Sequence, residues 1–222
     1  MTLAASVLLV LVACSTDNPT TTGPTTSGTD GTGSLGTVTE LPAPPTAEPS
    51  DGGVESRTTY PFGVPSSAVT INHPAPAPNL PRLVAVYVGD HPEGDPAFQR
   101  VSFYFRGGFP TYRFQFVPTI VQDATGDPIP LDAAYALSVV FVGAQAHDDD
   151  GDSTVAESPS RPIGFSALRD LAAAGDFEGQ VSYGIGVIEA GDSPAAIRVG
   201  ELERPDNAGG SFFVVYFDVR AG

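Results

Sequence analysis

The sequence predicts an all-β protein, a β-sandwich of short and mostly antiparallel strands. Short runs of aromatic and β-branched residues, separated by Gly, Pro and Asp, fill its second half, and this is the pattern of strands and turns. About six to nine such runs, with turns every ~8 to 15 residues, are typical of a sandwich or a barrel. The runs that we expect to be strands are 82–91, 99–108, 112–117, 135–144, 180–189, 195–202 and 211–220.

Two of these runs, 99–108 and 112–117, predict a hairpin. The first run alternates between an apolar and a polar set, as a strand with one buried face does. The apolar set is Val101, Phe103 and Phe105, and the polar set is Arg100, Ser102, Tyr104 and Arg106. After the tight connection "GGFPT", aromatic residues alternate with Arg113 and Gln115. We therefore expect the chain to return beside itself, with Arg106 and Arg113 near the turn.

Two further segments differ from simple alternation. The run "SFFVVYFDVR" (211–220) is apolar on both faces, which predicts a central strand. The segment "FSALRDLAAAGD" (165–176) has helix-forming composition, because Leu168, Leu171 and Ala172 follow helical spacing. This segment is either a helix or a strand and a loop.

The N-terminus has the features of an export signal. Residues 3–12 are uncharged and almost wholly apolar, which is the length of a signal-peptide core and too short to span a bilayer. The four residues that end in Cys14, "LVAC", resemble the lipobox of bacterial lipoproteins. The resemblance implies that residues 1–13 are removed and that Cys14 carries a lipid, which would hold the chain on the outer side of the cell membrane. The alternative is a free cysteine at the end of an ordinary secretory signal.

The composition divides the rest of the chain. Residues 14–60 are mainly Thr, Ser, Gly and Pro with few large apolar side chains, so we expect a disordered linker. A Pro-rich lead-in over 61–81 precedes a domain over 82–222. The formal net charge is -16 and all basic residues are arginine. Such an acidic chain repels phosphate backbones, so we exclude nucleic acid as a partner.

An acidic segment, "HDDDGDS" (147–153), raises the question of a metal. Asp148, Asp150 and Asp152 stand at alternate positions, as in a calcium loop. The register of an EF-hand fails, because Gly151 is fourth when Asp148 is counted as first, and Pro159 stands at position twelve. We expect a solvated acidic loop, with a calcium site of another kind as the alternative.

No pattern in the sequence indicates catalysis. The three histidines are scattered, and motifs such as HExxH, GxSxG and a phosphate-binding glycine loop are absent from the sequence. Cys14 is assigned to the anchor, so no thiol nucleophile is left. We expect a protein without enzymatic activity and without a cofactor.

Four segments, in this order, resemble the AMIN-like domain of bacterial lipoproteins. They are "RVSFYFRGGFPTYRFQFV", "LSVVFVGAQAHDDDGDS", "GDFEGQVSYGIGV" and "FFVVYFDVR", and the resemblance covers roughly residues 80–220. It implies a β-sandwich that binds cell-wall peptidoglycan without catalysis. Two other functions stay open: an adaptor that binds an envelope protein, and a module that binds calcium or a small solute.

Binding to a glycan with stem peptides needs exposed aromatic rings and cations that engage carboxylates. The polar sides of the expected hairpin supply Tyr104, Arg106 and Arg113, which are our candidate ligand-binding residues. The alternative is that these arginines are only solvated or paired with neighbouring carboxylates. We expect Asp176 and Glu178 to serve a turn, with Phe177 packed in the core.

Overall fold

The computed structural model describes residue 54 and residues 56–74, 79–206 and 208–222. These residues form fourteen strands and no helix. The strands are β1 (Ser56–Gly63), β2 (Val69–Ile71), β3 (Arg82–His91), β4 (Phe98–Arg106), β5 (Thr111–Val117), β6 (Ile120–Val121), β7 (Pro128–Ile129), β8 (Tyr135–Val142), β9 (Leu168–Phe177), β10 (Gln180–Val187), β11 (Glu189–Ala190), β12 (Ser193–Pro194), β13 (Ile197–Pro205) and β14 (Ser211–Arg220).

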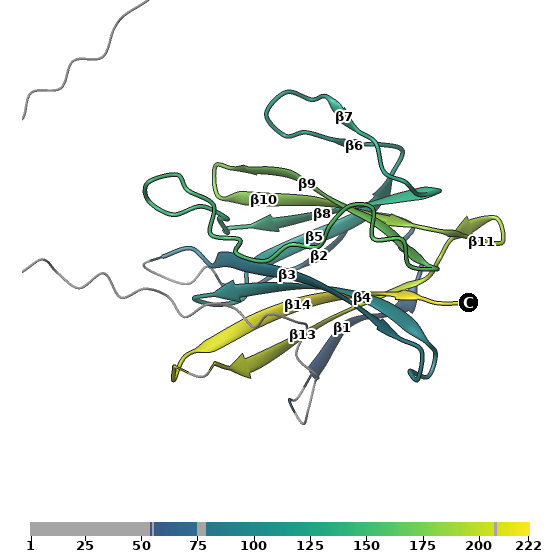
Figure 1. Cartoon of the computed structure of the whole chain (residues 1–222), viewed down its shortest axis with the longest axis horizontal. Coiled ribbons are helices and arrows are strands. Elements are labelled where there is room, and N and C mark those ends of the chain that lie inside the picture. The colour runs from purple at the N-terminus through teal and green to yellow at the C-terminus, as the bar shows by residue number, and fades with distance from the viewer. Residues whose placement is uncertain (1–53, 55, 75–78, 207) are drawn as a thin grey trace, which may run out of the picture. The chain divides into compact units, whose positions relative to one another are not determined.

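Two five-stranded sheets are stacked as layers (Figure 1). Sheet A has the order β1-β13-β14-β4-β3, and sheet B has the order β2-β5-β8-β10-β9. Every neighbouring pair within the two sheets is antiparallel. The predicted all-β antiparallel sandwich is therefore confirmed, and so is the central position of the apolar strand β14.

Side chains that alternate inward from both sheets fill the space between them. Phe103 and Phe217 come from sheet A, and Phe114 and Phe141 come from sheet B. The ring centroids of Phe103 and Phe141 are 4.9 Å apart, and those of Phe114 and Phe217 are 5.5 Å apart. Each fully buried ring of this kind contributes about 1.5–3 kcal/mol to folding. The aromatic alternation of the sequence is thus the origin of the core.

The expected hairpin between β4 and β5 is wrong. Strand β4 pairs with β3 and β14 in sheet A, whereas β5 pairs with β2 and β8 in sheet B. The connection crosses from one sheet to the other, and Gly107 and Gly108 adopt positive φ angles of 90° and 144° in it. Alternation shows which face of each strand is apolar, but it does not show whether a short connection stays in one sheet.

The polar face of β4 is also buried, contrary to the expectation of a half-buried strand. Because β4 lies between two neighbours in sheet A, long side chains of β14 cover it. The Arg100 guanidinium lies 3.9 Å from the Tyr216 ring centroid, and that of Arg106 lies 3.7 Å from the Phe212 ring centroid. Aromatic rings and guanidinium groups thus form a second packed layer outside sheet A.

The segment with helix-forming composition is a strand, so the helix alternative is wrong. Strand β9 is an edge of sheet B, and both Leu168 and Leu171 are buried in the core. A register shift in the pairing of β9 with β10, next to Leu168, lets two leucines three residues apart point to the same side. Because of this bulge, leucines with helical spacing in the sequence can face the same side of a strand.

Two strands lie ahead of residue 82, where we expected the domain to begin. Strand β1 pairs with β13 at the edge of sheet A, and β2 pairs with β5 at the edge of sheet B. The described end of the expected linker and the lead-in therefore belong to the sandwich. Residues 1–13 and Cys14 lie outside the described residues.

A small hairpin of β6 and β7 lies above the outer face of sheet B in Figure 1. Its first residue, Ile120, is buried against β10. A Cβ atom at Gly184 would lie only 2.5 Å from Ile120 Cγ1, and one at Gly186 would lie 2.7 Å from Ala133 Cβ. The glycines of "SYGIGV" are therefore required by the close approach of this segment to the outer face of sheet B.

Candidate functional site

The three candidate ligand-binding residues do not lie together. Tyr104 and Arg106 are on the outer side of sheet A and are only 2% and 8% exposed, respectively. The Arg106 side chain pairs with Asp206. Arg113 is exposed on β5, on the outer face of sheet B. The structure therefore separates Arg113 from the other two, and it leaves only Arg113 exposed.

Arg113 differs from most arginines of this chain. Seven arginines form ion pairs with carboxylates. Arg204 also has a partner. Among the described residues, no hydrogen bond or ion pair engages the side chains of Arg113 and Arg220. In a chain of formal charge -16, an exposed guanidinium without a carboxylate is available to a ligand.

A groove on the outer face of sheet B contains Arg113. A cavity of about 240 Å³ is lined by Arg113, Gln115 and Ser138, together with Ala68, Phe114 and Val140. A second hollow of about 130 Å³ shares Ser138 and Val140 with it and reaches Ser182 on β10. Guanidinium, amide and hydroxyl groups thus follow one another across β5, β8 and β10.

Phe177, at the end of β9, belongs to the same outer face. Register pairs it with Gln180, and pairs Gln180 with Val142, so the three side chains lie in one row across the sheet. Phe177 is 64% exposed, and Val142 is 37% exposed. The expectation that Phe177 is a core residue is wrong, because strand alternation turns Asp176 inward and Phe177 outward.

The expected turn does follow Phe177. Glu178 has a φ of 51° and Gly179 a φ of 72°, and these two residues connect β9 to β10. Between β5 and β9 lie two strands, so Arg113 and Phe177 are about 14 Å apart across the sheet, at ~4.8 Å per strand. A ligand that contacts both residues has to be elongated.

A larger, open pocket of about 680 Å³ lies at the free edge of β9. Its walls come from the β6–β7 hairpin, from residues 173–176 of β9 and from the segment 146–158. His147 Nδ1 lies 2.6 Å from Asp176 Oδ2, and Asp176 Oδ1 accepts a hydrogen bond from the Ala146 N–H. Burial, together with the Asp176 charge, raises the pKa of the Tyr183 hydroxyl in this pocket to about 12.

The acidic segment forms a compact loop beside that pocket. The Asp148 carboxylate accepts hydrogen bonds from the N–H groups of Asp150 and Asp152, each at 3.0 Å. Across the described ranges, no three His, Cys, Asp or Glu side chains are arranged to hold a metal ion. The contacts of Asp148 are those of a loop that organises its own backbone.

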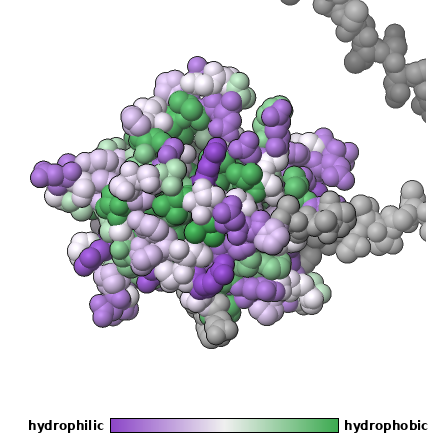
Figure 2. All heavy atoms as spheres, turned by 180° about the vertical axis from the view of Figure 1, so that it is seen from behind, coloured by the Kyte–Doolittle hydropathy of each residue, from purple (hydrophilic) through white to green (hydrophobic). Residues whose placement is uncertain are grey.

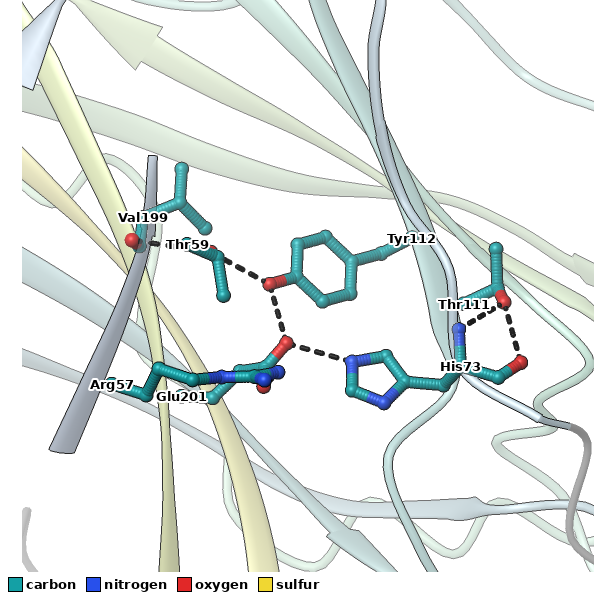
Figure 3. Close-up of polar contacts among 7 residues, drawn as sticks. All are labelled: Arg57, Thr59, His73, Thr111, Tyr112, Val199 and Glu201. Carbon is teal, nitrogen blue, oxygen red and sulfur yellow. Dashed lines mark hydrogen bonds and ion pairs between the residues drawn. The ribbon is translucent and has the colours of Figure 1, made fainter. Parts of the chain in front are cut away.

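The buried carboxylate of Glu201 lies at the side of the sandwich where β1 and β2 are the outer strands, with tyrosine, histidine and arginine side chains around it (Figure 3). Glu201 on β13 is 3% exposed. Its Oε1 accepts a hydrogen bond from the Tyr112 hydroxyl at 2.7 Å and lies 2.8 Å from His73 Nε2. Its Oε2 pairs with Arg57, and the Tyr112 hydroxyl also contacts Thr59.

The Glu201 cluster has the residue types of an acid–base site. None of the pockets described above is lined by Glu201, Tyr112 or His73. Burial is the main cause that raises the pKa of Tyr112, so its hydroxyl stays protonated. The hydrogen bonds of the cluster join β1, β13 and β5 with the residues after β2.

Neither the Glu201 cluster nor the His147–Asp176 pair follows a sequence motif. His73 and Glu201 are 128 residues apart, and His147 and Asp176 are 29 apart. No spacing rule connects such positions, because pairing between distant strands brings them together. Phe177 does lie next to a feature that the sequence shows, because it directly precedes the turn residues Glu178 and Gly179.

Hydrophobic side chains also reach the surface of the molecule. Figure 2 shows one face on which they gather mainly toward the middle, among hydrophilic side chains.

In the part of the chain that the structure describes, no helix has the length and apolar character needed to cross a membrane.

Comparison with known proteins gives one positive result. Neither curated proteins nor solved structures yield a significant match. The model of the AMIN-like domain family matches residues 81–219, which includes every strand of the two sheets except β1 and β2. This match covers more than half of the sequence, so the chain belongs to the AMIN-like domain family.

Proposed function

We propose that this chain is an extracytoplasmic lipoprotein whose AMIN-like domain binds cell-wall peptidoglycan without catalysing a reaction. Membership in the AMIN-like family implies a location in the cell envelope, outside the cytoplasm. The lipobox-like "LVAC" supports a lipid on Cys14, which would keep the domain at the membrane surface, within reach of the wall.

The observation that carries the proposal is the position of Arg113. Its guanidinium, which has no partner among the described residues, lies in the groove with Gln115 and Ser138, on the face that also exposes Phe177. A guanidinium can bind a stem-peptide carboxylate through two hydrogen bonds. An exposed aromatic ring can stack on the apolar face of a sugar. Both ligand features occur together in peptidoglycan, which is a glycan with acidic peptides.

The proposal that the domain is not an enzyme rests on the same geometry. Among the described residues, the cavity lined by Arg113 contains neither histidine nor a carboxylate that could act as acid or base, and the adjoining hollow contains a single carboxylate, Asp123. The cluster around Glu201 has such groups, but they are buried and occupied by one another.

Co-sedimentation with isolated cell wall tests this function. The probe is the full chain with Cys14→Ser, so that no lipid contributes to binding. We expect it to sediment with the wall, and we expect Arg113→Ala to weaken binding roughly tenfold, because a charge-assisted hydrogen bond is worth about 1.5–3 kcal/mol. Phe177→Ala should weaken binding as well.

The matched control is Arg220→Ala, which removes the other arginine without a partner among the described residues. It should sediment like the parent chain. If the parent chain sediments no better than an unrelated acidic protein, wall binding is excluded. If it sediments and neither Arg113→Ala nor Phe177→Ala weakens it, the outer face of sheet B is not the binding site. Retention of an envelope protein in place of the wall would favour an adaptor.

A further inference from the structure

The pocket at the free edge of β9 is separate from the groove around Arg113. At about 680 Å³ it is large enough for a small ligand. Much of its lining is apolar and comes from short side chains, including Ala173, Ala174, Val155 and Val181. The polar part of the lining includes Asp176 and His147, which contact each other, and the side chains of Gln122, Ser153, Ser158 and Tyr183. The pocket thus combines small apolar side chains with one carboxylate, that of Asp176.

Negative charges predominate around the pocket. Asp176 is the carboxylate in its lining, no arginine is part of that lining, and the four aspartates of the 148–152 loop adjoin it. The Asp123 carboxylate packs against Gly175, which also lines the pocket. Arg82, at the start of β3, pairs with Asp149 of this loop at 3.5 Å. An anion is therefore repelled, and a cation is attracted.

The hydrogen bonds of Asp176 leave room for a further donor. Oδ2 is engaged by His147 Nδ1 and Oδ1 by the Ala146 N–H, whereas a carboxylate has about four acceptor positions. The Asp176 side chain is also 26% exposed, so a ligand can reach it. The negative charge felt by the Tyr183 hydroxyl agrees with this polarity.

We propose that this pocket binds a primary ammonium group carried on a short aliphatic chain, as in a lysine-like side chain. The ammonium group binds the Asp176 carboxylate, and its aliphatic stem packs on the alanine and valine side chains of the wall. The proposal does not depend on wall binding, because it concerns a different part of sheet B and another ligand chemistry.

A pair of matched probes isolates the ammonium group. Nα-acetyl-lysine amide and Nα-acetyl-norleucine amide have the same four-carbon stem, and only the first carries the ammonium. Titration of the ¹⁵N-labelled full chain at low salt, followed by NMR, reports binding and its location. We expect the lysine probe to shift the amide signals of residues 173–176, and the norleucine probe to bind at least about tenfold more weakly.

Three variants make the test specific. Asp176→Asn should remove the preference for the lysine probe. Ser153→Arg, which adds a cation at the exposed rim and leaves Asp176 intact, should weaken the lysine probe and leave the norleucine probe unchanged. Asp192→Asn, at an exposed turn far from the lining in sequence, should bind as the parent does.

Several results overturn the proposal. These are equal binding of the two probes, absence of binding by both, shifts that map away from the pocket, and an unchanged preference in both Asp176→Asn and Ser153→Arg. The dispersion of the NMR spectrum shows whether each variant is folded. Loss of folding in Asp176→Asn alone leaves Ser153→Arg to decide the outcome.

Discussion

Two buried carboxylates, Asp218 and Asp170, bind groups from other segments of the chain. Asp218, with 0% exposure, accepts hydrogen bonds from Arg100 at 2.6 Å and from Arg198 at 2.6 and 2.8 Å. Asp170 accepts two hydrogen bonds from Arg161 and one from the Asp132 N–H. Each of these carboxylates has its charge compensated, which a buried ion requires.

Asp170 gives a pH-dependent prediction. The hydrogen bond from Arg161 is the first cause that lowers the pKa of Asp170 below its ordinary value of 3.8. The unfolded state therefore takes up the proton first as the pH falls. The stabilisation by ionised Asp170 is complete above about pH 5 and is lost as the pH falls below about 4 and through the lowered pKa.

The measurement is chemical unfolding of the parent and of Asp170→Asn, followed by circular dichroism from about pH 7 to about pH 2. We expect Asp170→Asn to be less stable by about 1–3 kcal/mol at neutral pH, with the difference shrinking in acid. Asp127→Asn, in an exposed hairpin, is the control that should show no such trend. A difference that stays constant with pH would contradict the role of ionised Asp170.

At the residue scale, the sequence predicted the site only in part. Arg113 was among the three candidate residues and is exposed on a groove. Tyr104 and Arg106 share its polar alternation, yet they are buried because β4 is an inner strand of sheet A. A polar residue on a strand is exposed only if nothing covers that face, and the sequence around the residue does not contain this information.

At the scale of elements, strands were easier to locate than to pair. The runs 82–91, 112–117 and 211–220 coincide closely with β3, β5 and β14. The partners of these strands were not evident, as the wrong β4–β5 hairpin shows. Short connections are compatible with pairing inside one sheet or with a crossing between sheets, and packing of the whole core decides between them.

The contact between β10 and the β6–β7 hairpin gives a prediction at this scale. Gly184→Ala places a methyl group against Ile120, so we expect the free energy of unfolding to fall by about 1–3 kcal/mol through overpacking. The double variant Gly184→Ala with Ile120→Ala should be more stable than the sum of the two single effects predicts, because the new methyl group occupies vacated space.

Chemical unfolding of both single variants and of the double variant measures this coupling. Gly222→Ala, at a position where an added Cβ meets nothing, is the control and should be neutral. Strict additivity of the two changes would show that Ile120 and position 184 do not compete for space.

At the scale of the whole molecule, the segment of β1 and β2 closes one side of the sandwich. It adds the outer strand to sheet A at β13 and to sheet B at β5. It also contributes Arg57 and His73 to the Glu201 carboxylate. The family match begins at residue 81, so this chain completes its sheets with strands from outside the matched region.

Removal of this segment should destabilise the domain. We expect residues 79–222 to be less stable than residues 54–222 by roughly 3–5 kcal/mol, because the buried Glu201 loses two partners and two sheet edges are opened. Urea unfolding of both shortened chains measures the difference. The chain that begins at residue 54 is the control and should unfold in one cooperative transition. Equal stability of the two would assign β1 and β2 no structural role.

The sequence by itself determined the fold class and the location of most strands, because alternation with period two and glycine-rich turns are local properties of the chain. Only the tertiary structure decided which sheet each strand joins, which polar faces are covered, and that Asp176 and Phe177 face opposite ways. These outcomes depend on contacts between residues that are distant in sequence. Whether a polar face is buried depends on which strands and side chains cover it after both sheets have packed. The sequence of one segment does not contain this information.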